Sequence, residues 1–152
     1  MEIDQTDIRI LAAIQDNARI GLESLSEAAF LSVASVQRRL KKLRDKKIIL
    51  KEISVLDPVK IGQAMSFIVM VEMEKEGAEQ LEEFSKLAIA EPQVQQCYYI
   101  TGEADFCLIC TASNMKVFES LTHRLFIENP LICRFKTSVV MANKKVGLSL
   151  SL

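Results

Sequence analysis

The sequence divides into short segments whose apolar residues recur first with helical spacing and later with a mixture of strand-like and helical spacing. Within residues 1–47, three segments repeat apolar residues every three or four positions, which predicts three short helices. Ser32 precedes the third segment in the position of an N-cap, and Asp4 with Asp7 predicts a capping box at the first. The third segment has the clearest apolar stripe, consisting of Val33, Val36, Leu40 and Leu43.

These three helices are arranged as in a helix-turn-helix, with a short turn before the third. The first helix is expected to bury Ile8, Leu11 and Ile14, and the second to span residues 22–29. The apolar, β-branched run of residues 48–56 predicts a hairpin, or wing. Asp57-Pro58 then begins one helical turn that ends at Gly62, so we interpret residues 51–64 as wing strand and linker.

The second half of the chain alternates strand-like and helical patterns. Strands are expected over residues 65–74, 94–101, 106–112 and 132–141. One helix is expected from the apolar stripe of residues 78–88, stopped by Pro92, and another over residues 114–129. This order, strand-helix-strand-strand-helix-strand, is ferredoxin-like. The predicted fold class is therefore α+β, with a winged helix-turn-helix in residues 1–50 and a ferredoxin-like βαββαβ domain in residues 65–152. Residues 146–150 predict one more strand.

Two helices on one face of such a sheet leave the other face without cover. Several strand residues are too apolar for a fully solvated face. A second copy of the chain is therefore expected to cover it, giving at least a dimer. The residues assigned to that face are Met65, Ile68, Met70, Cys97, Tyr99, Cys107, Ile109, Phe135 and Val139.

Positive charge is concentrated in one stretch, although the whole chain has a net charge of −1. Residues 36–51 contain eight Lys or Arg and one acid, Asp45. A local basic footprint of this kind is typical of nucleic-acid binding. In the third predicted helix the positive side chains lie opposite the apolar stripe, which favours a major-groove recognition helix. The alternative is an ordinary surface helix with a solvated basic face.

Other kinds of chemistry find little support in the residues. We find no convincing carboxylate pair, no nucleophile with an adjacent base and no phosphate-binding glycine loop, which disfavours an enzyme. Cys107 and Cys110 form a C-x-x-C, but on a strand they point to opposite faces. Four cysteines without a signal peptide or membrane span suggest free thiols and a cytoplasmic protein, and no metal or cofactor is expected.

In both halves the sequence resembles the Lrp/AsnC, or feast/famine, family of transcriptional regulators. The resemblance covers almost the whole chain and depends on the order of many short motifs. The N-terminal motifs are Ile3-Asp4, Asp7, Ile10-Leu11, Asn17-Ala18-Arg19, Leu31-Ser32, Val36, Arg39-Leu40, Leu43, Ile48-Ile49, Val55-Leu56-Asp57-Pro58 and Ile61-Gly62. The C-terminal motifs are Pro92-Gln93-Val94, Cys97-Tyr98, Thr101-Gly102-Glu103-Ala104-Asp105-Phe106 and Thr137-Ser138-Val139-Val140-Met141.

The resemblance implies a DNA-binding domain joined to an effector domain, called the RAM domain. It also implies a homodimer formed through the sheet face, often assembled as four dimers in an octamer, with an amino acid or similar small metabolite bound between dimers. Double-stranded DNA and the effector are thus the expected partners, and association with the nucleoid the expected location. An architectural protein that wraps DNA without an effector is the alternative.

Conventional docking of the third helix assigns roles to its residues. Base edges are expected to meet Ser32, Ala34, Ser35 and Arg38, and phosphates Gln37, Arg39, Lys41 and Lys42, with Lys51 in the wing. About four phosphate-binding cations per subunit give a dimer a slope of log K against log salt near −7. The alternative for Arg39 is a packing arginine whose stem covers the apolar stripe.

The turn at residues 101–105 is the candidate effector site. Its glycine allows backbone amides to approach a carboxylate, while an acid can pair with an ammonium group. Without the resemblance, the same residues describe a hairpin turn with solvated acids. The candidate effector residues are Tyr99, Thr101, Gly102, Glu103, Ala104, Asp105 and Thr137.

Some residues depart from the family pattern. Lys47 and Lys51 stand where relatives usually have glycine, and Phe30 where they have glycine or asparagine. A left-handed backbone at such positions has to be tolerated by a larger side chain, or the turn differs. Phe135 replaces a threonine common near the effector, which would reshape the pocket.

Overall fold

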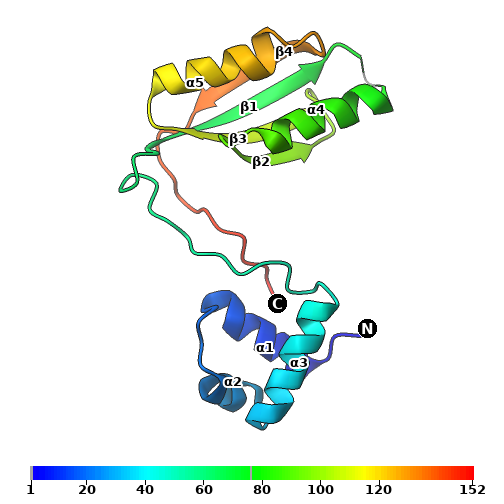
Figure 1. Cartoon of the computed structure of the whole chain (residues 1–152), viewed down its shortest axis with the longest axis vertical. Helices are drawn as coiled ribbons and strands as arrows, with labels where there is room; N and C mark the ends of the chain where they lie inside the picture. The colour runs from blue at the N-terminus through cyan, green and yellow to red at the C-terminus, as the bar shows by residue number, and fades with distance from the viewer. Residues whose placement is uncertain (1, 76) are drawn as a thin grey trace. The chain divides into compact units, whose positions relative to one another are not determined.

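The computed structural model describes residues 2–75 and 77–152, which fall into two compact units. One unit comprises the chain up to Val55 together with Lys145–Leu152, and the other comprises Leu56–Lys144. The first contains helices α1 (Gln5–Asp16), α2 (Leu22–Ala29) and α3 (Val33–Asp45), labelled in Figure 1. The predicted helix-turn-helix is confirmed.

The predicted caps fix where these helices begin. The Asp4 carboxylate accepts hydrogen bonds from the backbone N–H groups of Thr6 and Asp7, at 2.9 and 2.8 Å. In return the Asp7 carboxylate accepts the Asp4 N–H at 3.3 Å, which completes the capping box. At α3, the Ser32 hydroxyl accepts the Ser35 N–H at 3.3 Å. Both helices therefore start where the sequence predicts.

The core of this unit differs from the prediction in α1. Ile10 is fully buried, whereas Ile8, Leu11 and Ile14 are half-buried. Asp7 is buried too, and Ile10 follows it by three residues, on the same side of the helix. Asp7 forms an ion pair with Arg39 of α3, with 2.7 Å between Asp7 Oδ1 and Arg39 Nη1, so this side of α1 faces α3. The fully or nearly fully buried apolar residues are Ile10, Leu25, Ala29, Val36, Leu40 and Leu43.

Two predicted strands are absent. Residues 46–64 contain no strand, so the wing predicted at 48–56 is wrong, and residues 146–150 are likewise extended without a ladder. A strand needs a hydrogen-bonding neighbour, and neither segment has one within this chain. The Asp57 carboxylate does cap a turn over residues 58–62, accepting the N–H groups of Val59 and Lys60.

The second unit is a four-stranded antiparallel sheet with helices, as predicted. Along the chain come β1 (Met65–Met73), α4 (Ala78–Ala90), β2 (Val94–Tyr99) and β3 (Phe106–Ala112). They are followed by α5 (Met115–Thr122), a π-helical turn η1 (His123–Ile127) and β4 (Ile132–Val139). The strand order β2-β3-β1-β4 is visible in Figure 1 and is that of the ferredoxin-like βαββαβ arrangement.

Both helices pack on the same face of this sheet. The Phe67 ring on β1 stacks on Phe118 of α5 with 3.6 Å between centroids, and Phe106 on β3 meets Phe84 of α4 edge-on at 4.9 Å. Within residues 2–75 and 77–152, no helix is both long and apolar enough to cross a membrane. The main core residues are Phe67, Val69, Val71, Phe84, Ala88, Phe106, Leu108, Cys110, Phe118, Leu121 and Phe126.

The strand register corrects the set of residues assigned to the uncovered face. Cross-strand partners share a face, and five of the predicted residues pair with core residues or stand in register with them. Alternation alone does not say which set of positions faces the helices. The five residues on the helix-covered face are Met65, Cys97, Tyr99, Phe135 and Val139. We define the open sheet face by the apolar residues Ile68, Met70, Tyr98, Cys107 and Ile109.

Candidate functional site

The outer side of α3 presents the side chains that the sequence predicts. Ala34, Gln37, Arg38, Lys41 and Lys42 are all exposed. Before them, the hydroxyl groups of Ser32 and Ser35 are hydrogen-bonded to each other at 3.0 Å. The start of the helix is therefore slim and polar, and positive charge follows along the same side.

The cations of α3 divide into two groups. Arg44 pairs with Glu52 at 2.7 Å, and Arg39 pairs with two aspartates of the α1 capping box. Across the residues that the structure describes, Arg38, Lys41 and Lys42 have no ion-pair partner. These three positive charges are available to a ligand outside the chain.

Arg39 does not belong to the group of unpaired cations on the outer side of α3. Its Nη1 lies 2.7 Å from Asp4 Oδ2 and 2.7 Å from Asp7 Oδ1. Hydrogen bonds to Asp7 and Asp4 raise the pKa of Arg39 above its usual value. The pKa of Asp4 is lowered, first by the Asp7 backbone N–H and then by the Arg39 guanidinium. The structure thus gives Arg39 an ion pair with α1, a role that differs from both the predicted phosphate contact and a stem that covers the apolar stripe.

Phe30, Lys47 and Lys51 stand where relatives usually have glycine or asparagine, and the structure shows their backbone conformations. Phe30 and Lys47 adopt left-handed backbone conformations, with φ of 56° and 54°, so both tolerate the geometry that glycine favours. The Arg9 guanidinium lies 5.3 Å from the centre of the exposed Phe30 ring. Lys51 has no positive φ and lies in an extended segment, not in a hairpin.

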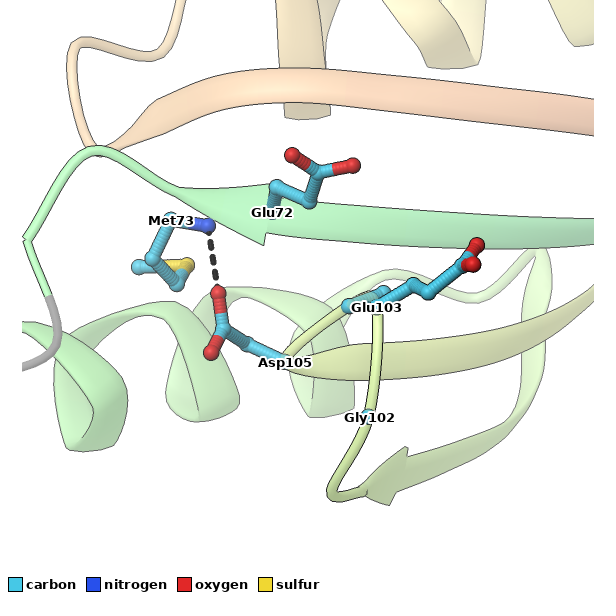
Figure 2. A pocket seen from close by; sticks show the side chains of 6 residues that line it. Glu72, Met73, Gly102, Glu103 and Asp105 are labelled. Carbon is cyan, nitrogen blue, oxygen red and sulfur yellow. Dashed lines mark hydrogen bonds between the residues drawn. The ribbon is translucent and has the colours of Figure 1, made fainter.

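The predicted effector turn lines a shallow cavity of about 130 Å³ in the second unit, and Figure 2 shows it. Gly102 has a φ of +127°, a conformation that favours glycine, and the turn is closed by a hydrogen bond from Ile100 N–H to Asp105 O at 2.8 Å. The full lining is Glu72, Met73, Gly102, Glu103, Ala104 and Asp105.

The three carboxylates of the cavity differ in their hydrogen-bond partners. Asp105 accepts the Met73 N–H at 2.7 Å, which joins the turn to β1 (Figure 2). Glu72 is held by the Arg134 guanidinium through three contacts of 2.8–3.0 Å. Among the described residues, Glu103 has no hydrogen-bond or ion-pair partner in the structure, and neither do the backbone N–H groups of residues 102–104. The turn therefore offers free donors beside a free carboxylate.

Three predicted effector residues do not line the cavity. Tyr99 lies beside Phe106 on the helix-covered face, with 5.4 Å between ring centres and the ring planes tilted by 53°. Thr101 is exposed at the start of the turn, and Thr137 is exposed on β4 opposite Val69, also on the helix-covered face. Sequence reasoning missed Glu72 and Met73, because only the register of β1 beside β3 and β4 brings them to the turn.

No other chemistry is assembled in the described chain. Residues 2–75 and 77–152 contain no group of three His, Cys, Asp or Glu side chains that could hold a metal ion. Cys107 and Cys110 lie on opposite faces of β3, as predicted. Burial raises the pKa of Cys110 to about 12, which keeps it a thiol.

Comparison with protein families matches both halves of the chain. Residues 3–44 match the AsnC-type helix-turn-helix domain, and residues 66–150 match the Lrp/AsnC ligand binding domain. An uncharacterized HTH-type transcriptional regulator, y4tD of Sinorhizobium fredii, is 41% identical over 95% of this chain and 86% of its own length. The Bkd operon transcriptional regulator of Pseudomonas aeruginosa is 30% identical over 87% of this chain and 83% of its own.

Solved structures of transcriptional regulators share the fold of this chain. The complex of transcriptional regulator NMB0573 from Neisseria meningitidis with L-Met has a TM-score of 0.91 and 27% identity, covering 99% of this chain and 97% of that one. An AsnC family transcriptional regulator from Agrobacterium tumefaciens has a TM-score of 0.90 and 22% identity, covering 97% and 96%. The chain therefore belongs to the Lrp/AsnC family, whose members are transcriptional regulators and not enzymes.

Proposed function

We propose that this regulator binds double-stranded DNA with the outer side of α3 in the major groove. The observation that carries the proposal is the set of three unpaired, exposed cations on that side, Arg38, Lys41 and Lys42. Ser32, Ala34, Ser35 and Arg38 read base edges; Gln37, Lys41, Lys42 and Lys51 hold phosphates. Arg38 is the candidate for a bidentate contact to guanine, worth about 1–3 kcal/mol of discrimination.

The test starts with a duplex selected from a random pool by binding to the full chain. Arg38→Ala should weaken binding to that duplex more than to random DNA, because it removes a base contact. Lys42→Ala should weaken both alike and make the salt slope shallower, because it removes a phosphate contact. Lys116→Ala removes an exposed cation on α5 and is the control. Binding that neither Arg38→Ala nor Lys42→Ala alters would refute the proposal.

We propose further that the cavity at the turn binds a free amino acid. A zwitterion requires donors for its carboxylate and an acceptor for its ammonium group. The free N–H groups of residues 102–104 provide the first, and the Glu103 carboxylate provides the second. The solved complex of the Neisseria meningitidis regulator with L-Met supports an amino-acid ligand in this fold.

Calorimetry with L-methionine, followed by the other L-amino acids, tests this proposal. At least one amino acid should bind, and Glu103→Gln should weaken it because the ammonium group loses its ionic partner. Glu74→Gln, on an exposed carboxylate outside the cavity lining, is the matched control. If no amino acid binds while DNA binding is intact, the effector-independent architectural role replaces this proposal.

We also propose that the open sheet face is covered by a second copy of the chain. Ile68, Met70 and Ile109 form an apolar surface on a sheet whose other face packs against α4 and α5. Burial of such a surface is the main favourable term in most protein association. A dimer would also contain two copies of α3.

A further inference from the structure

One cation of the recognition helix is turned away from the free surface. The Arg39 Nη1 contacts Asp4 Oδ2 and Asp7 Oδ1, both at 2.7 Å, so one guanidinium nitrogen bridges two carboxylates of α1. The Asp7 side chain is only 2% exposed. Arg39 is therefore the charge partner of a buried acid, and that acid belongs to a different helix.

The two carboxylates that hold Arg39, those of Asp4 and Asp7, are themselves fixed by hydrogen bonds. All four carboxylate oxygens of the capping box are used. Asp4 Oδ1 accepts the N–H groups of Thr6 and Asp7, and Asp7 Oδ2 accepts the Asp4 N–H. The two remaining oxygens both accept from Arg39. Neither aspartate can swing away without breaking the cap of α1, so the position of the guanidinium is set by the backbone of that helix.

The apolar stripe of α3 cannot supply the same restriction. Val36, Leu40 and Leu43 hold the helix against the core, but apolar contact is not directional and tolerates small rotations. A hydrogen-bonded ion pair is directional, and it stands beside the stripe, at about 100° of helix rotation from Arg38. The ion pair therefore decides which way Arg38 faces.

We propose that Arg39 is a positioning residue that fixes the rotation of α3 about its own axis and so aims Arg38 at the base edges. This inference depends on the proposed DNA binding by α3. Arg39 then makes no phosphate contact, because reaching a phosphate would leave the buried Asp7 without its partner. The phosphate-binding cations are Lys41, Lys42 and Lys51, and the salt slope of a dimer becomes about −5 in place of −7.

The experiment measures affinity against salt concentration for the selected duplex and for random DNA. Arg39→Ala should lower the affinity of a dimer for the selected duplex about a hundredfold, about tenfold for each of two lost base contacts, and leave the salt slope unchanged. Lys42→Ala should lower the magnitude of a dimer's slope by about 1.8, for two lost phosphate contacts. An equal fall in slope for Arg39→Ala, with equal losses on both DNAs, would overturn the inference.

Asp4→Asn gives the sharper test, because the two accounts predict opposite signs. Asparagine is as good an N-cap as aspartate, but it removes the Asp4 half of the ion pair and leaves Arg39 held by Asp7 alone. If Arg39 positions the helix, this substitution lowers affinity for the selected duplex and leaves the slope unchanged. If Arg39 holds a phosphate, the substitution weakens the binding of the guanidinium to α1 and removes a negative charge, so affinity for both DNAs rises and the inference is wrong.

Two controls separate failure of this inference from other failures. Circular dichroism at the binding temperature establishes that each variant has the wild-type helix content, and Asp4→Asn carries the test if Arg39→Ala does not fold. Arg38→Ala and Lys42→Ala report on the proposed DNA binding itself. Wild-type selectivity in Asp4→Asn, combined with lost selectivity in Arg38→Ala, overturns the positioning role and leaves α3 as the DNA reader.

Discussion

At the scale of single residues, Lys47 carries a backbone cost just after α3. Its φ is 54°, and its N–H donates to the carbonyl of Arg44, as expected where a helix ends. Glycine adopts this conformation without steric cost, whereas other residues lose about 1 kcal/mol. Lys47→Gly should therefore raise the free energy of unfolding by about 1 kcal/mol in urea titrations.

The preceding residue provides the matched control for that prediction. Lys46 has a φ of −84°, which every residue tolerates, so Lys46→Gly should give no gain and only the usual entropic loss of glycine. Both substitutions remove one exposed lysine from the same turn. Equal effects of the two would show that charge, and not backbone geometry, sets the change.

The thiols should differ widely in reactivity. Burial raises the pKa of Cys110 to about 12, whereas Cys133 is exposed. The thiolate is the reactive species, so at pH 8 a brief treatment with maleimide should label Cys133 and leave Cys110 unmodified. Peptide mass spectrometry measures the two sites. Labelling of Cys110 at the rate of Cys133 in the folded protein would contradict the burial seen here.

How far the sequence predicts the candidate site depends on whether a residue's neighbours are local. The turn from Gly102 to Asp105 was predictable as a turn because turn chemistry depends on adjacent residues, whereas its choice as the effector site came from the family resemblance. Glu72 and its partner Arg134 were not, because they meet only through the register of β1 and β4. Tyr99 and Thr137 were wrongly expected to line the cavity because the sequence alone does not give the strand register.

At the scale of elements, the capping box of α1 makes the stability of the folded state depend on pH. The folded-state pKa of Asp4 is below its usual value of 3.8, so the folded state favours the charged carboxylate. That contribution to stability is complete above pH 3.8 and is lost as pH falls through the lowered pKa. Urea midpoints measured from pH 5 to pH 2 should fall less steeply in Asp4→Asn than in wild type.

The elements also show which local patterns suffice. All five predicted helices form near the expected residues, because helical hydrogen bonds join residues four apart. The four strands of the second unit form because each finds a neighbour in one sheet. Residues 48–56 and 146–150 have similar apolar alternation and no neighbour, so they stay extended.

At the scale of the whole molecule, the open sheet face should control self-association. Ile68 lies at its centre on β1, and Ile68→Lys would place a charge in an apolar interface between copies. Ile89→Lys is the matched control, because Ile89 is 76% exposed on α4. Sedimentation velocity should show smaller species for Ile68→Lys alone. Unchanged assembly in both variants would place the interface elsewhere.

The same substitution connects assembly to DNA binding. Each copy of α3 and its following segment offers three phosphate-binding cations in this account, so one chain should show a salt slope near −3 and a dimer near −5. Ile68→Lys changes no residue of the DNA-binding unit, yet it should halve the slope by removing the second copy. Fluorescence anisotropy across salt concentrations measures it. A full slope from a monomeric variant would mean that one chain makes all the phosphate contacts, and that more of its cations reach DNA than those on the free side of α3.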